Sequence, residues 1–129
     1  MKTALVIEDQ PDNMVLITRL LEKHGFRTLS ACTGTEGIEL ALRQRPDFII
    51  LDIQLPDMNG TEVLARIRAE IGSGIAVIAM TSFAMAGDRE RLLAAGCDGY
   101  IEKPINPKVV IQQIRKVIGE GDEDTDRRR

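Results

Sequence analysis

Short hydrophobic runs that alternate with helical patterns constrain the fold of this chain more than any other feature. Five such runs are expected to be strands: residues 3–7, 27–31, 48–53, 75–81 and 100–101. Two of them, FIILDI at 48–53 and IAVIAMT at 75–81, are hydrophobic at almost every position. This pattern is typical of strands in a parallel sheet that is covered on both faces. The alternation therefore predicts an α/β fold with right-handed helical crossovers between parallel strands.

Helix start and stop signals lie between and after these runs. They stand at Pro11 and Gly25, at Thr35, at Gly60, at Asp88 and Gly96, and at Asn106 with Pro107. Caps of this kind begin helices, and glycine commonly ends them. We therefore expect a (βα)5 fold with a doubly wound, open, parallel five-stranded sheet.

The length of 129 residues allows one domain, which we place at residues 1–118. The remaining stretch, GEGDEDTDRRR at 119–129, has no hydrophobic residue and is expected to be a disordered charged tail. No hydrophobic run approaches the length of a membrane span, and the start does not look like a signal peptide. We expect a cytoplasmic protein that does not bind membranes.

Charge and aromatic content argue against a nucleic-acid partner. The formal net charge is −3, and the tail holds five acidic residues and three arginines, so the rest of the chain is nearly neutral. Only 3% of the residues are aromatic and none is tryptophan, which leaves no basic stripe and no stacking platform. Cys32 and Cys97 lack the spacing of a zinc site or a disulfide scaffold.

Polar residues stand at the carboxyl ends of four predicted strands: Glu8 and Asp9, Asp52, Thr81 with Ser82, and Lys103. In an open parallel sheet these ends meet at one edge, where ligands bind. Three carboxylates at close range repel one another unless a cation lies among them, and Mg²⁺ with its oxygen ligands suits such a site. With Lys103 added, the assembly is close to neutral and can receive a phosphoryl group, with Asp52 as nucleophile.

These residues, with the run DIQLPDMNG at 52–60 and YIEKP at 100–104, resemble the receiver domain of two-component response regulators of the stand-alone chemotaxis or cell-division type. The resemblance covers residues 3–118 and implies a flavodoxin-like sheet with strand order 2-1-3-4-5. It implies that Asp52 is the phosphoacceptor, that Asp9, Asp52 and the carbonyl of Gln54 bind Mg²⁺, and that Glu8 acts through a water molecule.

The same resemblance implies roles for the other residues at this edge. Lys103 would bind the phosphoryl group, Thr81 would be the switch hydroxyl, and Tyr100 would be the aromatic side chain that changes rotamer. Ser82 would be the small residue that leaves room for the phosphoryl group. Phe83, two positions after Thr81, is expected to obstruct water and so to prolong the life of the acyl phosphate.

The expected function is a phosphorylation-dependent signalling switch with no enzymatic activity beyond its own phosphorylation and dephosphorylation. Its partners would be a sensor histidine kinase or histidine phosphotransfer protein and a downstream protein target. We expect a monomer or a weak dimer that depends on phosphorylation. Three alternatives stay open: a phosphatase or phosphotransferase of the haloacid-dehalogenase type, a flavodoxin-like nucleotide-binding module, and a receiver excised from a larger hybrid kinase.

A docking surface is predicted from the first helix. Its inward stripe is expected at Asn13, Leu16, Ile17, Leu20 and His24, which leaves Met14 and Val15 outside the core. Ile105 follows Lys103 and Pro104 on the same rim. We expect these three exposed hydrophobic side chains to form a patch that packs against helices of the phosphodonor protein.

Overall fold

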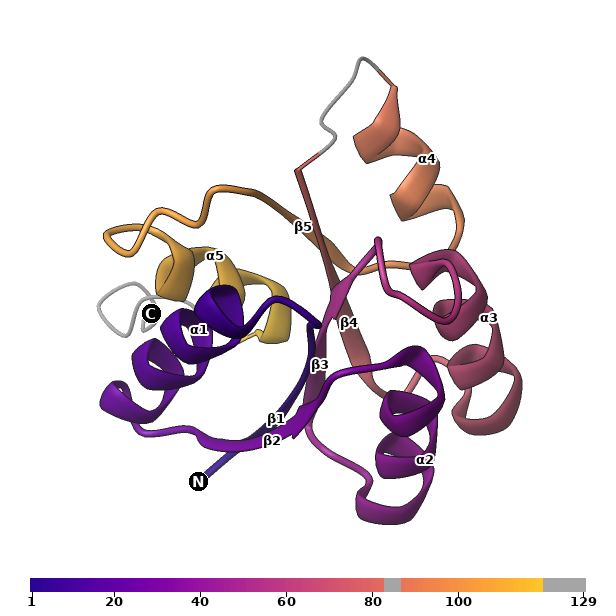
Figure 1. Cartoon of the computed structure of the whole chain (residues 1–129), viewed down its shortest axis with the longest axis horizontal. Helices are drawn as coiled ribbons and strands as arrows, with labels where there is room; N and C mark the ends of the chain where they lie inside the picture. The colour runs from indigo at the N-terminus through magenta and orange to yellow at the C-terminus, as the bar shows by residue number, and fades with distance from the viewer. Residues whose placement is uncertain (83–86, 120–129) are drawn as a thin grey trace.

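A parallel sheet flanked by two layers of helices forms the frame of the computed structural model, which describes residues 1–82 and 87–119 (Figure 1). The strands are β1 (Thr3–Ile7), β2 (Arg27–Ala31), β3 (Phe48–Asp52), β4 (Ala76–Thr81) and β5 (Gly99–Glu102). Their spatial order is β2-β1-β3-β4-β5, and every neighbouring pair is parallel. The predicted strand order and sheet type are confirmed.

Five helices cover the two faces of the sheet in the described part of the chain: α1 (Pro11–Lys23), α2 (Gly34–Gln44), α3 (Gly60–Ile71), α4 (Asp88–Ala94) and α5 (Val110–Ile118). Helices α1 and α5 lie on one face, and α2, α3 and α4 lie on the other (Figure 1). This arrangement is the predicted doubly wound fold. None of these helices is long and hydrophobic enough to cross a membrane.

Two hydrophobic clusters, one on each face, hold the helices to the sheet. In β1, Leu5 and Ile7 belong to the cluster under α2 and α3, while Ala4 and Val6 belong to the cluster under α1 and α5. All four side chains are fully buried. Because successive side chains of a strand point to opposite faces, a strand that is buried on both faces must be hydrophobic at every position.

Three helix starts differ from the prediction. Helix α2 begins at Gly34 with Thr33 as its cap, and not at Thr35. Asn106 and Pro107 do not begin α5; instead the Asn106 side chain accepts a hydrogen bond from the Lys108 amide and closes a turn before Val110. Asp88 is the first residue of α4 and not its cap, because Gly87 occupies the capping position with a φ of 88°. Residues 120–129, the greater part of the predicted tail, lie outside the described residues.

Gly60 lets the start of α3 lie directly against the end of β3. Its amide donates a hydrogen bond of 2.8 Å to the carbonyl of Ile53. A Cβ atom at this position would lie 2.6 Å from the Ile53 Cα and 2.8 Å from the Asp52 carbonyl oxygen. Both neighbouring atoms belong to the backbone, so no side-chain rotation relieves the clash. Glycine is therefore required by close approach and not by a special turn.

Asp57 ties the loop between β3 and α3 to the start of α2. Its carboxylate accepts hydrogen bonds from the Gly34 amide at 2.8 Å, the Thr35 amide at 3.0 Å and the Thr35 hydroxyl at 2.8 Å. These donors favour the charged carboxylate and lower the pKa of Asp57 to about 2. The negative charge also stands at the positive end of the α2 dipole.

We predict that Asp57→Asn destabilises the protein at pH 5 and that this difference shrinks as the pH falls towards 2. A carboxylate whose folded pKa lies below its ordinary value of 3.8 stabilises the fold above that value and loses this effect as it is protonated. Urea unfolding of both proteins at several pH values measures the difference. Asp12→Asn, at an exposed acid of α1, is the matched control. A difference that stays constant from pH 5 to 2.5 would contradict the prediction.

Candidate functional site

Acidic side chains from two strand ends and a lysine from a third meet at one edge of the sheet. Glu8 and Asp9 follow β1, Asp52 ends β3, and Lys103 follows β5. Carboxylate oxygens of the three acids all lie within 4.8 Å of one another. The parallel sheet thus brings together four residues that the sequence placed at this edge.

Lys103 lies between two of the carboxylates. Its Nζ is 3.0 Å from Glu8 Oε1 and 3.2 Å from Asp52 Oδ2, and its side chain is only 12% exposed. Burial raises the pKa of Glu8, which is fully enclosed, although the Gln10 amide and Lys103 act against this shift. Burial also works to lower the pKa of Lys103, but the hydrogen bonds and charges of Glu8 and Asp52 outweigh it and the pKa is raised. The ammonium is therefore held in its charged form.

The remaining carboxylate oxygens have distinct surroundings. Glu8 Oε2 accepts a hydrogen bond from the Gln10 amide, and Asp52 Oδ1 accepts one from the Gln54 amide, both at 3.0 Å. Glu8 Oε1 is buried and accepts no well-oriented hydrogen bond from the described residues, despite its short distance to Lys103. A buried oxygen of this kind beside two further carboxylates fits a hard divalent cation with oxygen ligands, such as Mg²⁺.

A cavity of about 500 Å³ opens beside these groups. It is lined by Asp9, Gln10, Asn13, Asp52, Gln54, Ser82, Lys103 and Pro104. The sequence did not predict Gln10 or Asn13 as members of the site, and Asn13 was expected on the inward stripe of the first helix. Their spacing of three residues at the start of a predicted helix, directly after Glu8 and Asp9, is the signal that could have identified them.

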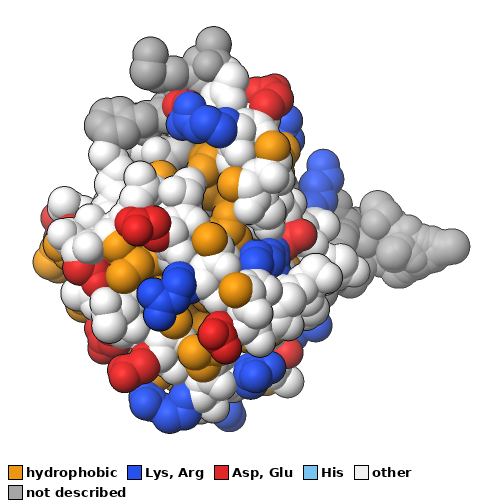
Figure 2. All heavy atoms as spheres, turned by 90° about the vertical axis from the view of Figure 1, so that its right-hand side faces the viewer, with side chains coloured by type: hydrophobic (Ala, Val, Ile, Leu, Met, Phe, Trp, Pro, Cys, Tyr) orange, Lys and Arg blue, Asp and Glu red, His pale blue; other side chains and the backbone are white. Residues whose placement is uncertain are grey.

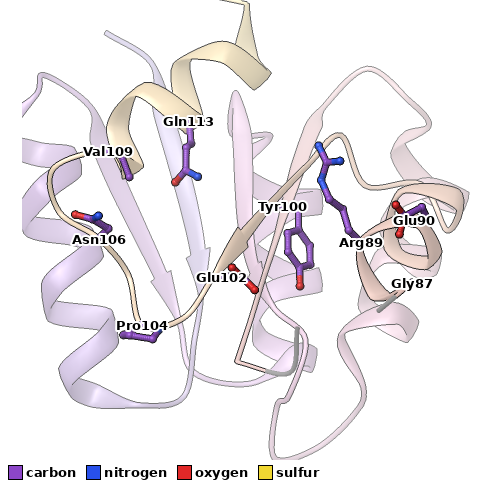
Figure 3. Close-up of a pocket in the computed structure, with 9 residues that line it drawn as sticks. All are labelled: Gly87, Arg89, Glu90, Tyr100, Glu102, Pro104, Asn106, Val109 and Gln113. Atoms are coloured by element: carbon purple, nitrogen blue, oxygen red, sulfur yellow. The ribbon is translucent and has the colours of Figure 1, made fainter. Parts of the chain in front are cut away.

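Thr81 and Tyr100 do not line this cavity. Thr81 is buried and lines a separate cavity of about 420 Å³ between α3 and α4, together with Ile53 and Leu92. Tyr100 is half-buried and lines a third cavity, formed by α4, β5 and the segment leading into α5 (Figure 3). Ser82 does reach the acidic cavity, where its hydroxyl donates a long hydrogen bond of 3.4 Å to Gln54 Oε1.

The predicted patch of three exposed hydrophobic side chains is wrong. Val15 is 46% exposed, but Ile105 is only 7% exposed and packs in the core under α1 and α5. Met14 is half-buried against the same core, because the buried stripe of α1 runs through Ile17 and Leu21. His24, which was placed in that stripe, is exposed. Phe83 lies outside the described residues.

Comparison with known proteins decides the family. The family model described as the response regulator receiver domain matches residues 4–115, nearly all of the described chain. The chain belongs to the receiver domain family. Receivers of two-component systems are signalling proteins and not classical enzymes, so the family match does not support the phosphatase alternative.

Curated and solved relatives agree with this assignment. The polar-differentiation response regulator DivK of Brucella anthropi is 40% identical over 120 residues, which cover 92% of this chain and 98% of the relative. The receiver domain of the sensor histidine kinase PA1611 of Pseudomonas aeruginosa is 34% identical, with 92% and 98% coverage and a TM-score of 0.83. A CheY-like receiver of Methanospirillum hungatei is 29% identical, with 93% and 95% coverage and a TM-score of 0.85. The receiver resemblance seen in the sequence is confirmed.

We predict that Lys103→Met destabilises the metal-free receiver by about 2 kcal/mol, because it leaves two buried carboxylates without their cation. Added Mg²⁺ should stabilise the variant more than the wild type, since it replaces part of the missing positive charge. Urea unfolding in EDTA and in Mg²⁺ measures both effects. Lys116→Met, at an exposed lysine of α5, is the control. Equal stability of Lys103→Met and wild type in EDTA would contradict the electrostatic account of this site.

Proposed function

We propose that this receiver is a phosphorylation switch in which Asp52 accepts a phosphoryl group in a Mg²⁺-dependent reaction. The donor would be a sensor histidine kinase or a histidine phosphotransfer protein, and the result would be a change in the surface presented to a downstream protein. The observation that carries the proposal is the convergence of Asp52, two further acids and a buried lysine at one edge of the sheet, beside an open cavity.

The surroundings of Asp52 suit a nucleophile towards phosphorus. The Gln54 amide binds Oδ1 and Lys103 binds Oδ2, so the carboxylate is held in one orientation. Phosphoryl transfer needs mainly positioning and positive charge on the phosphoryl oxygens, and Lys103 supplies one such charge. When bound, Mg²⁺ supplies the other. Glu8, Asp9, Asp52 and the Gln54 carbonyl would hold it. The PA1611 receiver carries a magnesium ion in its active-site cleft.

The switch would pass from Asp52 to the α4–β5–α5 face through β4 and β5. Met80 of β4 pairs with Asp52, and the next residue, Thr81, accepts a hydrogen bond of 2.8 Å from the Lys103 amide. A Thr81 hydroxyl drawn towards a phosphoryl group would leave its cavity beside α4. Figure 3 shows the Tyr100 ring on β5 beside the Arg89 side chain of α4. A movement of α4 that follows the movement of Thr81 would therefore change the surroundings of Tyr100.

The proposed partners are proteins. Figure 2 shows acidic and basic side chains interspersed on the face that carries α3 and α4, without the single-sign field that nucleic-acid binding requires. We propose a cytoplasmic monomer, or a dimer that forms weakly on phosphorylation. The likeness to the polar-differentiation response regulator DivK favours a response regulator of that kind, and the likeness to the PA1611 receiver favours a receiver that is a domain of a sensor histidine kinase.

We predict that Asp52→Asn abolishes labelling by acetyl phosphate and that Asp9→Ala weakens Mg²⁺ binding at least several-fold. The first change removes the nucleophile, and the second removes a charged metal ligand. Phosphorylation can be followed by mass spectrometry, and metal binding by titration calorimetry. Undiminished labelling of Asp52→Asn would overturn the assignment of the phosphoacceptor.

We further predict that Val15→Asp slows phosphoryl transfer from the cognate kinase several-fold, because a hydrophobic anchor of this size contributes about 1–2 kcal/mol to docking. Labelling by acetyl phosphate, which needs no docking surface, should not change. Val109→Asp is a matched control, since Val109 is also exposed but lines the cavity of Tyr100 and not the acidic cavity. Ile105 is unsuitable for this test because it is buried. Equal slowing with both donors would show damage to the site and not to a docking surface.

A further inference from the structure

Asn13 is an amide in the acidic cavity that neither the fold nor the proposed metal site uses. It is the third residue of α1, where it stands one turn before the fully buried Ile17. Among the described residues its side chain makes no hydrogen bond, and it caps neither its own helix nor another. Asparagine is an ordinary to poor helix former, so helix formation gives no reason for it at this position.

The direction of the reaction places the leaving group on the more exposed side of the acidic cavity. An in-line displacement requires the leaving group to lie opposite the attacking oxygen of Asp52. Asp52 and Lys103 are largely buried, whereas the other lining residues are half-buried or exposed. A phosphodonor must therefore enter from the side of these more exposed residues, and its leaving group must depart past them.

Four of the cavity residues besides the acids and Lys103 carry a polar side chain that can hydrogen-bond a leaving group: Gln10, Asn13, Gln54 and Ser82. The Gln54 and Ser82 side chains contact each other. Gln10 is exposed and precedes the helix, so ordering its longer side chain costs more entropy. Asn13 is half-buried on a helix whose next turn is fixed in the core, so its amide is the one that is held in place and unpaired.

We propose that Asn13 binds the anionic leaving group of acyl phosphate donors and so helps to determine which phosphodonors this receiver accepts. This inference rests on the proposed function of Asp52. With acetyl phosphate, a lone pair of an Asp52 carboxylate oxygen forms the new O–P bond while the bond from phosphorus to the bridging oxygen breaks. The electron pair of that bond leaves on the bridging oxygen as acetate, and no proton is transferred.

The Asn13 amide N–H can donate a hydrogen bond to the oxygen on which this negative charge develops. A donor aimed at developing charge accelerates the reaction, and hydrogen bonds to charged groups are the stronger ones. Phosphoramidate provides the contrast, because its leaving nitrogen departs as neutral ammonia from a zwitterionic donor. No negative charge develops on that nitrogen, so the same N–H contributes little.

We therefore predict that Asn13→Ala slows phosphorylation by acetyl phosphate about five- to tenfold and phosphorylation by phosphoramidate less than about twofold. Asn13→Asp, which removes the donor and adds a negative charge at similar size, should slow the acetyl phosphate reaction further. The rates are measured by stopped flow or by mass spectrometry at fixed Mg²⁺. Gln112→Ala, at an exposed amide of α5, is the matched control and should react as wild type with both donors.

Beryllofluoride binding separates this role from a structural one. Beryllofluoride mimics the bound phosphoryl group but has no leaving group, so its affinity for Asn13→Ala should equal that for wild type. Equal slowing with both phosphodonors, weaker beryllofluoride binding, or an unchanged acetyl phosphate rate would each overturn the role of Asn13. If neither donor phosphorylated wild-type Asp52, the proposed function itself would fail, and the role of Asn13 would fail with it.

Discussion

The contact of the Lys103 ammonium with Glu8 and Asp52 is the interaction on which the structure of the acidic site and its proposed chemistry depend. Without it, buried carboxylates would face one another across the strand ends. The contact spans the sheet, because β5 is separated from β1 by β3 and β4. The hydrogen bond from the Lys103 amide to the Thr81 carbonyl fixes where the lysine backbone begins, and its long side chain covers the remaining distance. Sheet order and side-chain length thus produce the site together.

The fold and the acidic edge could be predicted from the sequence because each rests on a local signal. Hydrophobic runs identify buried parallel strands, and a polar residue at the end of such a run must lie at the ligand-binding edge. The face of α1 could not be predicted in the same way. Its leucines and isoleucines fit a stripe that begins at Asn13 as well as one that begins at Met14, and a shift of one residue rotates the stripe by about 100°. Packing against α5 and the sheet selects the second stripe.

Features that depend on two segments far apart in the chain could not be predicted from the sequence. Ile105 follows a lysine and a proline in a loop, where no periodicity indicates whether a side chain faces the core. Asp57 is an ordinary loop acid until the fold brings the start of α2 to it. The separate cavity of Thr81 is likewise defined by α3 and α4 and not by residues near it in sequence. Each of these features depends on how helices and strands lie relative to one another, and that arrangement is determined only when the hydrophobic core has formed.

Gly60 has a consequence for how substitutions in this protein are interpreted. It lies in the same short run as Asp52, the proposed phosphoacceptor, and loss of either residue is expected to remove signalling. The two losses have different causes. A side chain at position 60 collides with the backbone of Asp52 and Ile53, whereas a change of the Asp52 side chain introduces no such collision. A mutational scan that measures cellular abundance would show a loss at position 60 and not at position 52. A scan that measures signalling would show a loss at both positions. Positions in this run therefore tolerate no substitution for two different reasons, the fold at Gly60 and the proposed chemistry at Asp52.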